Sequence, residues 1–143
     1  MLENLVNTES VININPSDID SYGHLAYEKF PLYHEIGRND LLKKLGYKDA
    51  RSGTWGNIEL IVYDVHYRIA RSIDAGVNGV MLRTRLRKKG KGETYQVVSD
   101  LRSVEGDKLY CRFRAVMKFR DIDSRQGVKI PKDFVDRVSM CRD

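Results

Sequence analysis

The residues best placed to do chemistry lie in one segment, Asp18-Ile-Asp20-Ser-Tyr-Gly23-His24-Leu-Ala-Tyr27. Its two carboxylates, Asp18 and Asp20, come just before a stretch with helical spacing. A helix N-terminus has unsatisfied backbone N–H groups and a positive dipole, so it can hold a developing oxyanion. A carboxylate nearby could attack a carbonyl carbon or activate a water molecule. The segment therefore has the parts that acyl transfer requires.

The same segment also has a purely structural interpretation. Asp and Ser residues before a helix are most often caps and turn formers. By spacing alone this interpretation is favoured, and Asp18, which is nearer the preceding strand, is the stronger candidate for a turn residue.

The hydropathy pattern predicts one long helix to position this segment. Apolar positions follow helical spacing from Tyr27 to Leu45. Pro31 fits a helix only in its first turn, so we expect regular helix to begin at residues 28–31. Gly46 follows the last apolar position, as is typical of a C-terminal cap.

Strands are expected before and after this helix, at residues 9–15, 58–69, 80–88, 94–104 and 109–120, with a short helix opening at Pro131. The last strand alternates most clearly, with apolar residues on one face and arginines on the other. One apolar helix facing one side of an antiparallel sheet predicts an α+β fold whose other sheet face meets water.

Length and composition fit one domain, which we assign to residues 1–143. The chain is 41% hydrophobic and 31% charged, and its 143 residues suffice to bury one core. Its formal net charge of +5 permits nucleic acid, an anionic membrane or a phosphorylated small molecule as partner and selects none of them.

Membrane and metal chemistry are not expected from this sequence. No apolar run approaches the ~18–20 residues of a membrane helix, and the N-terminus lacks the pattern of a signal peptide. Cys111 and Cys141 lack metal-ligand spacing and are predicted to be free thiols. We therefore expect a cytoplasmic protein with no membrane association and no metal.

Asp18-x-Asp20-x-x-Gly23-His24 resembles the signature of the 4-hydroxybenzoyl-CoA thioesterase-like group of hotdog-fold proteins. In the same register, Phe30 and Tyr33 occupy two aromatic positions of that group, and Glu35-x-Gly37-Arg38 matches its E-x-A-R. Asp64-Val-His-Tyr67-Arg-Ile-Ala70 is similar to a second stretch of the family. The predicted order of strand, helix and four strands also suits this group.

The resemblance implies an antiparallel sheet of about five strands wrapped around one long central helix. It implies that Asp20 is the catalytic carboxylate, as nucleophile or as base for water, and that the backbone N–H of Tyr27 is the oxyanion donor. A homodimer or homotetramer with active sites at the dimer interface is also implied. Ala26, Tyr27 and Ile69 depart from the family's usual residues, which leaves the acyl group open.

The expected substrate is an acyl thioester of coenzyme A (CoA) or of an acyl carrier protein. No cofactor is required, because CoA or phosphopantetheine enters only as part of the substrate. The further residues expected at the site are His24, Gly23, Tyr67, Trp55, Lys88, Lys89 and Lys91. Each has a structural alternative: His24 can pack against the first strand, Trp55 can cover the core, and the lysines can solvate a turn.

Two other functions stay open. A non-catalytic hotdog module would bind acyl-CoA as a sensor or scaffold, without turnover. A basic β-rich domain could bind nucleic acid, but it would need aromatic residues interleaved with Lys and Arg on an exposed face. The basic face of residues 109–120 carries only one aromatic residue, Tyr110. We therefore expect a thioesterase without a nucleic-acid partner.

Overall fold

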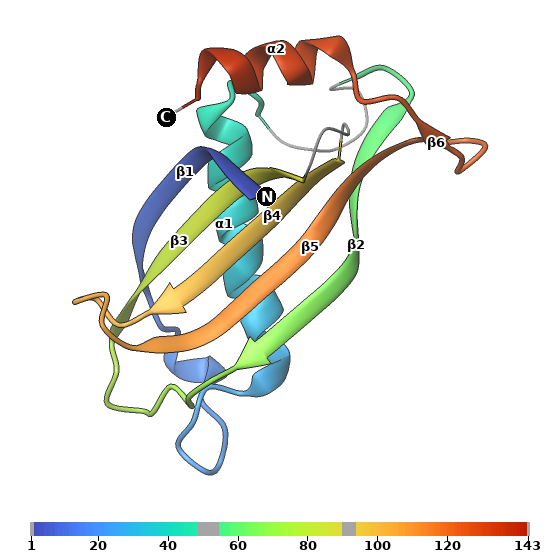
Figure 1. Cartoon of the computed structure of the whole chain (residues 1–143). Helices are drawn as coiled ribbons and strands as arrows, with labels where there is room; N and C mark the ends of the chain where they lie inside the picture. Colours follow the sequence, from blue (N-terminus) through green and yellow to red (C-terminus); the bar gives the residue numbers. More distant parts are fainter. Residues whose placement is uncertain (1, 49–54, 90–93, 143) are drawn as a thin grey trace.

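The computed structural model describes residues 2–48, 55–89 and 94–142 (Figure 1). Its strands and helices are β1 (Leu2–Asn13), α1 (Phe30–Lys44), β2 (Ile58–Ile69), β3 (Gly79–Lys89), β4 (Thr94–Arg102), β5 (Leu109–Asp121), β6 (Gly127–Val128) and α2 (Lys132–Met140). Two 3-10 turns, Pro16–Asp18 and Tyr27–Lys29, precede α1. None of the described helices is long and apolar enough to cross a membrane.

The strands form one antiparallel sheet in the order β1-β3-β4-β5-β2, with β6 paired to β5. The sheet curves around α1, and α2 lies across the end of the sheet where α1 finishes (Figure 1). This arrangement confirms the predicted α+β fold. Helix α1 also begins and ends as predicted, with Pro31 in its first turn and Gly46 after its last residue at a φ of +92°.

The first strand is longer than the sequence predicts. It begins at Leu2 instead of residue 9, and it pairs with β3 along its whole length. A register shift between Asn4 and Val6 makes Leu5 and Val6 both buried, so the chain loses its alternation there. Because a bulge breaks the period of two, the strand pattern cannot be followed through it.

Helix α1 approaches the sheet most closely at Gly37. A Cβ atom at this position would overlap Thr84 Oγ1 and would lie 3.1 Å from Leu82 Cδ2 and 3.2 Å from Ser99 Oγ. Thr84 and Ser99 are fully buried, and their hydroxyls hydrogen-bond across β3 and β4 at 3.2 Å. Gly37 therefore sets the depth at which the helix lies on the sheet.

Two apolar clusters pack along the helix. The first turns of α1, with Phe30 and Tyr33, pack with Leu25 and Ile73 from the flanking loops. The later turns pack with the residues of α2 and with the far ends of the strands. The first cluster holds the start of the helix, and therefore the segment that carries the two aspartates.

Replacing Gly37 with alanine tests this close contact. We expect Gly37→Ala to lower the free energy of unfolding by about 1–3 kcal/mol, because the added methyl group overpacks the helix–sheet contact. Urea denaturation of Gly37→Ala, Thr84→Ala and the double variant should show that Thr84→Ala restores part of the loss. Gly76→Ala, whose Cβ meets nothing within 4 Å, is the matched control. A Gly37→Ala protein as stable as the wild type would contradict the contact.

Candidate active site at the start of helix α1

The segment with the two aspartates forms a loop in front of α1. Ile19 and Leu25 pair as an isolated antiparallel bridge. Next to this bridge, the Ala26 N–H donates to the Asp18 carbonyl at 3.0 Å. The Leu25 N–H donates to the Ile73 carbonyl at 2.8 Å, which ties the loop to the chain that follows β2. The backbone thus holds residues 18–26 directly before the helix.

Asp20 lies at the exposed end of this loop. Its Oδ1 accepts hydrogen bonds from the backbone N–H groups of Tyr22, at 2.9 Å, and of His24, at 3.1 Å. No residue in the described ranges donates to its Oδ2. Asp20 is therefore a turn former, as the structural interpretation expects, and it presents one carboxylate oxygen to solvent. Its chemical role stays a prediction.

Asp18 has a different environment. Its side chain is only 16% exposed, and it lies 3.8 Å from Lys29 Nζ. Its Oδ2 accepts a hydrogen bond from the Tyr33 hydroxyl at 2.8 Å. Burial, together with the neighbouring Asp18 carboxylate, raises the pKa of Tyr33, which keeps the phenol protonated as a donor. Asp18 thus fastens the loop to the helix, and Asp20 is the carboxylate available for chemistry.

The first N–H groups of the helical segment are available as donors. The Tyr27–Lys29 turn runs directly into α1, and the Lys29 N–H donates to the Ala26 carbonyl at 2.9 Å. Within the described ranges, the N–H groups of Tyr27 and Glu28 donate to no acceptor. The helix dipole adds positive potential at this end. Such free donors can hold an oxyanion.

Gly23 and His24 complete the loop. Gly23 has a φ of +80°, a conformation that glycine adopts without strain, and it lets the chain turn between Asp20 and His24. The His24 side chain is 45% exposed and faces Asp74, with 3.5 Å between Nε2 and Oδ1. The structure therefore brings His24 into the loop but directs its ring toward Asp74.

Tyr67 lies on β2 and faces the helix. Its ring centroid is 5.1 Å from that of Phe113 and 5.9 Å from that of His34. The Arg38 guanidinium lies over the Phe113 ring at 4.9 Å. Burial raises the pKa of Tyr67, and the positive charge of Arg38 opposes that effect. Tyr67 thus stands beside the second turn of α1, half-exposed, at the open edge of the sheet.

A cavity of about 200 Å³ lies farther along α1, between the helix and the sheet. Glu35, Arg38 and Asn39 contribute its polar part, and its apolar lining consists of Leu41, Leu42, Leu60, Val62, Val97 and Met117. Arg38 belongs to this cavity and also contacts the aromatic group around Tyr67. In the described part of the chain, no cluster of His, Cys, Asp and Glu side chains could hold a metal ion.

Trp55, Lys88 and Lys89 are not brought together with Asp20. Trp55 packs against Tyr47 and Phe119, at ring distances of 5.0 and 5.2 Å, and covers the core where α1 ends. This placement supports its structural alternative. Lys88 and Lys89 end β3, whereas Asn13, at the end of β1 that leads into the loop, pairs with Gly79 at the other end of β3. The two lysines therefore lie about 30 Å from that end by the rise of a strand. Lys91 lies outside the described residues.

The burial of His34 is not predicted from the sequence, because this residue lies one position away from the predicted apolar stripe. It is completely buried, its ring stacks on Phe113, and its Nε2 lies 3.4 Å from Cys111 Sγ. Burial, helped by the positive charge of Arg38, lowers the pKa of His34 to about 3. Its spacing of four residues from Phe30 places it on the same face of the helix, and this is the pattern that indicates its burial.

Several solved structures have the same fold. The chain is similar to the DHNA-CoA thioesterase from Staphylococcus aureus, with 16% identity, a TM-score of 0.78 and coverage of 95% of this chain and 91% of that one. The 1,4-dihydroxy-2-naphthoyl-CoA thioesterase from Synechocystis is similar with 11% identity, a TM-score of 0.75 and coverage of 92% of this chain and 95% of that one. A hypothetical protein from Staphylococcus aureus in complex with CoA has 12% identity and a TM-score of 0.76, with coverage of 96% of this chain and 84% of that one.

These similarities define the fold class as a hotdog fold, as the resemblance implied. No curated protein matches the sequence. The family model of the Thioesterase-like superfamily matches residues 14–138, and the chain belongs to that superfamily. It is therefore a thioester hydrolase by class.

The buried His34 predicts a specific pH dependence of stability. Its folded pKa of about 3 lies below the ordinary value of 6.5, so between these values the unfolded chain binds a proton that the folded chain does not. The contribution of His34 to stability is thus lost as pH falls, by about 1.4 kcal/mol per pH unit. Urea denaturation from pH 7 to 4 should show this slope in the wild type and less of it in His34→Phe.

The exposed His66 provides the matched control for that series. His66→Gln should retain the wild-type slope, because the His66 side chain is 57% exposed and lies outside the core. Parallel stability curves for the wild type and His34→Phe would contradict the assignment of His34 as a buried neutral group.

Proposed function

We propose that the chain hydrolyses an acyl thioester at the loop in front of α1, with Asp20 as the catalytic carboxylate. The main observation behind this proposal is that two backbone N–H groups orient Asp20 through Oδ1 and leave Oδ2 free, in the loop that leads into α1. The free N–H groups of Tyr27 and Glu28 support the same location. The loop thus combines a fixed carboxylate with unoccupied oxyanion donors.

The reaction follows from these two groups. The thioester carbonyl oxygen accepts a hydrogen bond from the Tyr27 N–H, which stabilises the negative charge that develops on it. As base, Asp20 takes a proton from a water molecule whose oxygen bonds to the carbonyl carbon. The C–S bond then breaks, and the thiolate receives that proton. As nucleophile, Asp20 would instead bond to the carbonyl carbon, and the C–S bond would break to expel the thiolate and leave an anhydride. Water would then hydrolyse the anhydride to the free acid and the Asp20 carboxylate, and the released proton would go to the thiolate.

CoA is the favoured carrier of the acyl group. Two similar structures are named as CoA thioesterases and a third is in complex with CoA, which supports a CoA thioester here. The apolar lining of the cavity along α1 supports an apolar acyl group that extends past Tyr67. No metal or redox cofactor enters either route. The alternative, a non-catalytic module, predicts saturable binding of acyl-CoA without release of thiol.

Asp20→Asn tests the catalytic role directly. We expect its thiol release from a panel of acyl-CoA substrates to fall at least ~100-fold, because an amide can act neither as base nor as nucleophile. Circular dichroism should be unchanged, since the amide oxygen can still accept the two backbone hydrogen bonds. Equal rates for the variant and the wild type would remove Asp20 from the mechanism.

Two further carboxylates serve as comparisons for Asp20→Asn. Asp18→Asn distinguishes the two aspartates of the loop, and it should mainly lower stability, through the bond to Tyr33. Asp136→Asn, on the exposed side of α2, is the control for a remote loss of charge. If Asp18→Asn alone abolished thiol release, Asp18 would replace Asp20 in the mechanism.

We also propose that β2 pairs with β2 of a second copy. β2 is an edge strand, and its helix-facing residues Val65, Tyr67 and Ile69 are 42%, 41% and 39% exposed. Leu32 and Ile36 on α1 are exposed to a similar degree or more. Unpaired backbone groups beside exposed apolar side chains form a natural pairing surface. This pairing is compatible with a dimer or with a tetramer built from dimers.

A charge at this edge should disrupt the dimer. We expect Val65→Lys to turn a dimeric wild type into a monomer, measured by light scattering after size exclusion, and to lower thiol release with it. The control is Val11→Lys on the opposite edge strand β1, where Val11 is 61% exposed. A wild type that is monomeric at micromolar concentration would refute the pairing.

A further inference from the structure

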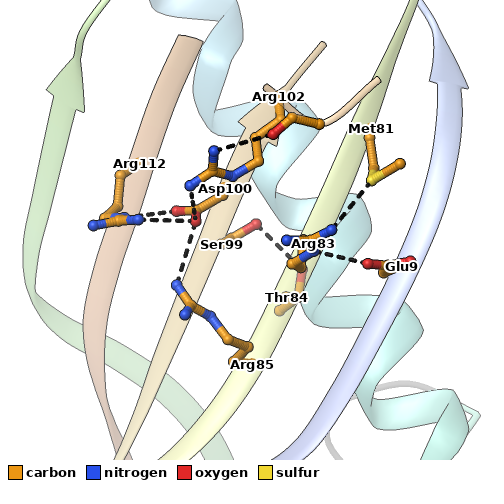
Figure 2. Close-up of polar contacts among 10 residues, drawn as sticks. Glu9, Met81, Arg83, Thr84, Arg85, Ser99, Asp100, Arg102 and Arg112 are labelled. Carbon is orange, nitrogen blue, oxygen red and sulfur yellow. Dashed lines mark hydrogen bonds and ion pairs between the residues drawn. The ribbon is translucent and has the colours of Figure 1, made fainter. Parts of the chain in front are cut away.

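A row of charged residues crosses the outer face of the sheet, one from each strand. The strand register aligns Glu9, Arg83, Asp100, Arg112 and Arg68 in this order. From Glu9 to Arg112 the sign alternates at each step, and Figure 2 shows these four side chains. The alternation ends at β2, where Arg68 stands opposite Arg112.

Arginine side chains already bind both carboxylate oxygens of Asp100. It is 2% exposed, and Arg112 contacts both of its oxygens, at 2.7 and 3.0 Å. Arg85 and Arg102 also reach its Oδ2, at 3.3 and 3.5 Å (Figure 2). One carboxylate therefore neutralises three guanidinium groups only in part, and it has nothing left for Arg68.

A hollow of about 330 Å³ lies between β2 and β5, lined by His66, Tyr67, Arg68, Arg112 and Arg114. In the register His66 stands opposite Arg114, and Arg68 stands opposite Arg112, so these four side chains share the outer face. We call it the arginine hollow. No carboxylate is among its lining residues.

Two of the three arginines in the hollow, Arg68 and Arg114, have no balancing carboxylate within the described chain, whereas Arg112 is paired with Asp100. Arg68 and Arg114 form no ion pair with any described residue. The nearby Asp64 is bound to His66, with 3.1 Å between Oδ1 and Nε2. Like charges directly opposite on neighbouring strands are unfavourable, and an anion between them reverses that interaction.

We propose that the arginine hollow binds the phosphate or diphosphate group of a small molecule. Guanidinium groups bind phosphate oxygens in bidentate geometry, and two of the three that line this hollow, Arg68 and Arg114, form no ion pair with a described residue. Pairing of β2 with a second copy would cover the edge of the sheet and leave its outer face open. The phosphate can belong to the nucleotide end of a CoA thioester or to a separate phosphorylated ligand.

Direct binding measurements test the site without reference to catalysis. Titration calorimetry with inorganic pyrophosphate and with adenosine 3′,5′-bisphosphate should show binding that weakens as salt increases. Arg68→Gln and Arg114→Gln should each raise Kd about tenfold, because each removes a charge-assisted hydrogen bond. Arg83→Gln is the matched control, since Arg83 lies on the same face but is paired with Glu9.

The outcomes of this titration are distinct. Unchanged binding in Arg83→Gln together with loss in the other two variants supports the site. The proposal is overturned if the wild type binds neither probe at millimolar concentration, or if Arg68→Gln and Arg114→Gln bind as the wild type does. A protein without thioesterase activity could still bind both probes, so failure of the proposed function would be seen separately.

Kinetics then identify the source of the phosphate. If the nucleotide end of the substrate occupies the hollow, Arg68→Gln and Arg114→Gln raise KM for an acyl-CoA and leave KM for the same acyl group on pantetheine unchanged. If pyrophosphate binding is lost while both KM values stay constant, the ligand is a separate phosphorylated molecule. Each result supports the site and assigns a different occupant.

Discussion

The close approach of Gly37 to Thr84 and Ser99 determines where the other parts of this molecule lie. A helix that rests on the sheet at this depth places Phe30 and Tyr33 in the core, which fixes the position of the first turn. Tyr33 in turn binds Asp18 and thereby holds the loop. The orientation of Asp20 and the free N–H groups of the helix start thus depend on a contact made two turns away, at a residue with no chemical group.

The sheet separates two environments with different chemistry. Its inner face is apolar and carries the helix, the half-exposed Tyr67 and the cavity that can receive an acyl group. Its outer face holds three arginines around the buried Asp100, which contribute to the positive net charge. The basic charge of the described outer face is thus concentrated around Asp100 and at the arginine hollow beside β2.

Local patterns in the sequence predict most of the elements and one part of the site. Alternation and helical spacing identify α1, β3 and β5, because each of these has one buried face. β4 is buried on both faces and β2 has no buried residue, so their β-branched and apolar composition, not alternation, indicates them. Asp20, Gly23 and the helix start are neighbours in the chain, so the spacing alone can bring them together. The bulge in β1 escapes detection because it interrupts the alternation.

Features that depend on long-range placement could not be predicted. Trp55, Lys88 and Lys89 look suitable by residue type, but the direction of β3 and the end of α1 place them away from the loop. The arginine hollow requires the register of β2 against β5, which no local pattern contains. His34 shows the same limit, since its burial depends on the sheet that covers it.

The proposed active site at the start of α1 is tested most directly by a crystal structure with an acyl-CoA analogue in which a methylene group replaces the thioester sulfur. We expect the carbonyl oxygen of the analogue to lie about 3 Å from the Tyr27 backbone nitrogen, with Asp20 Oδ2 facing the carbonyl carbon. A carbonyl group bound elsewhere, with the N–H groups of Tyr27 and Glu28 still unoccupied, would contradict it.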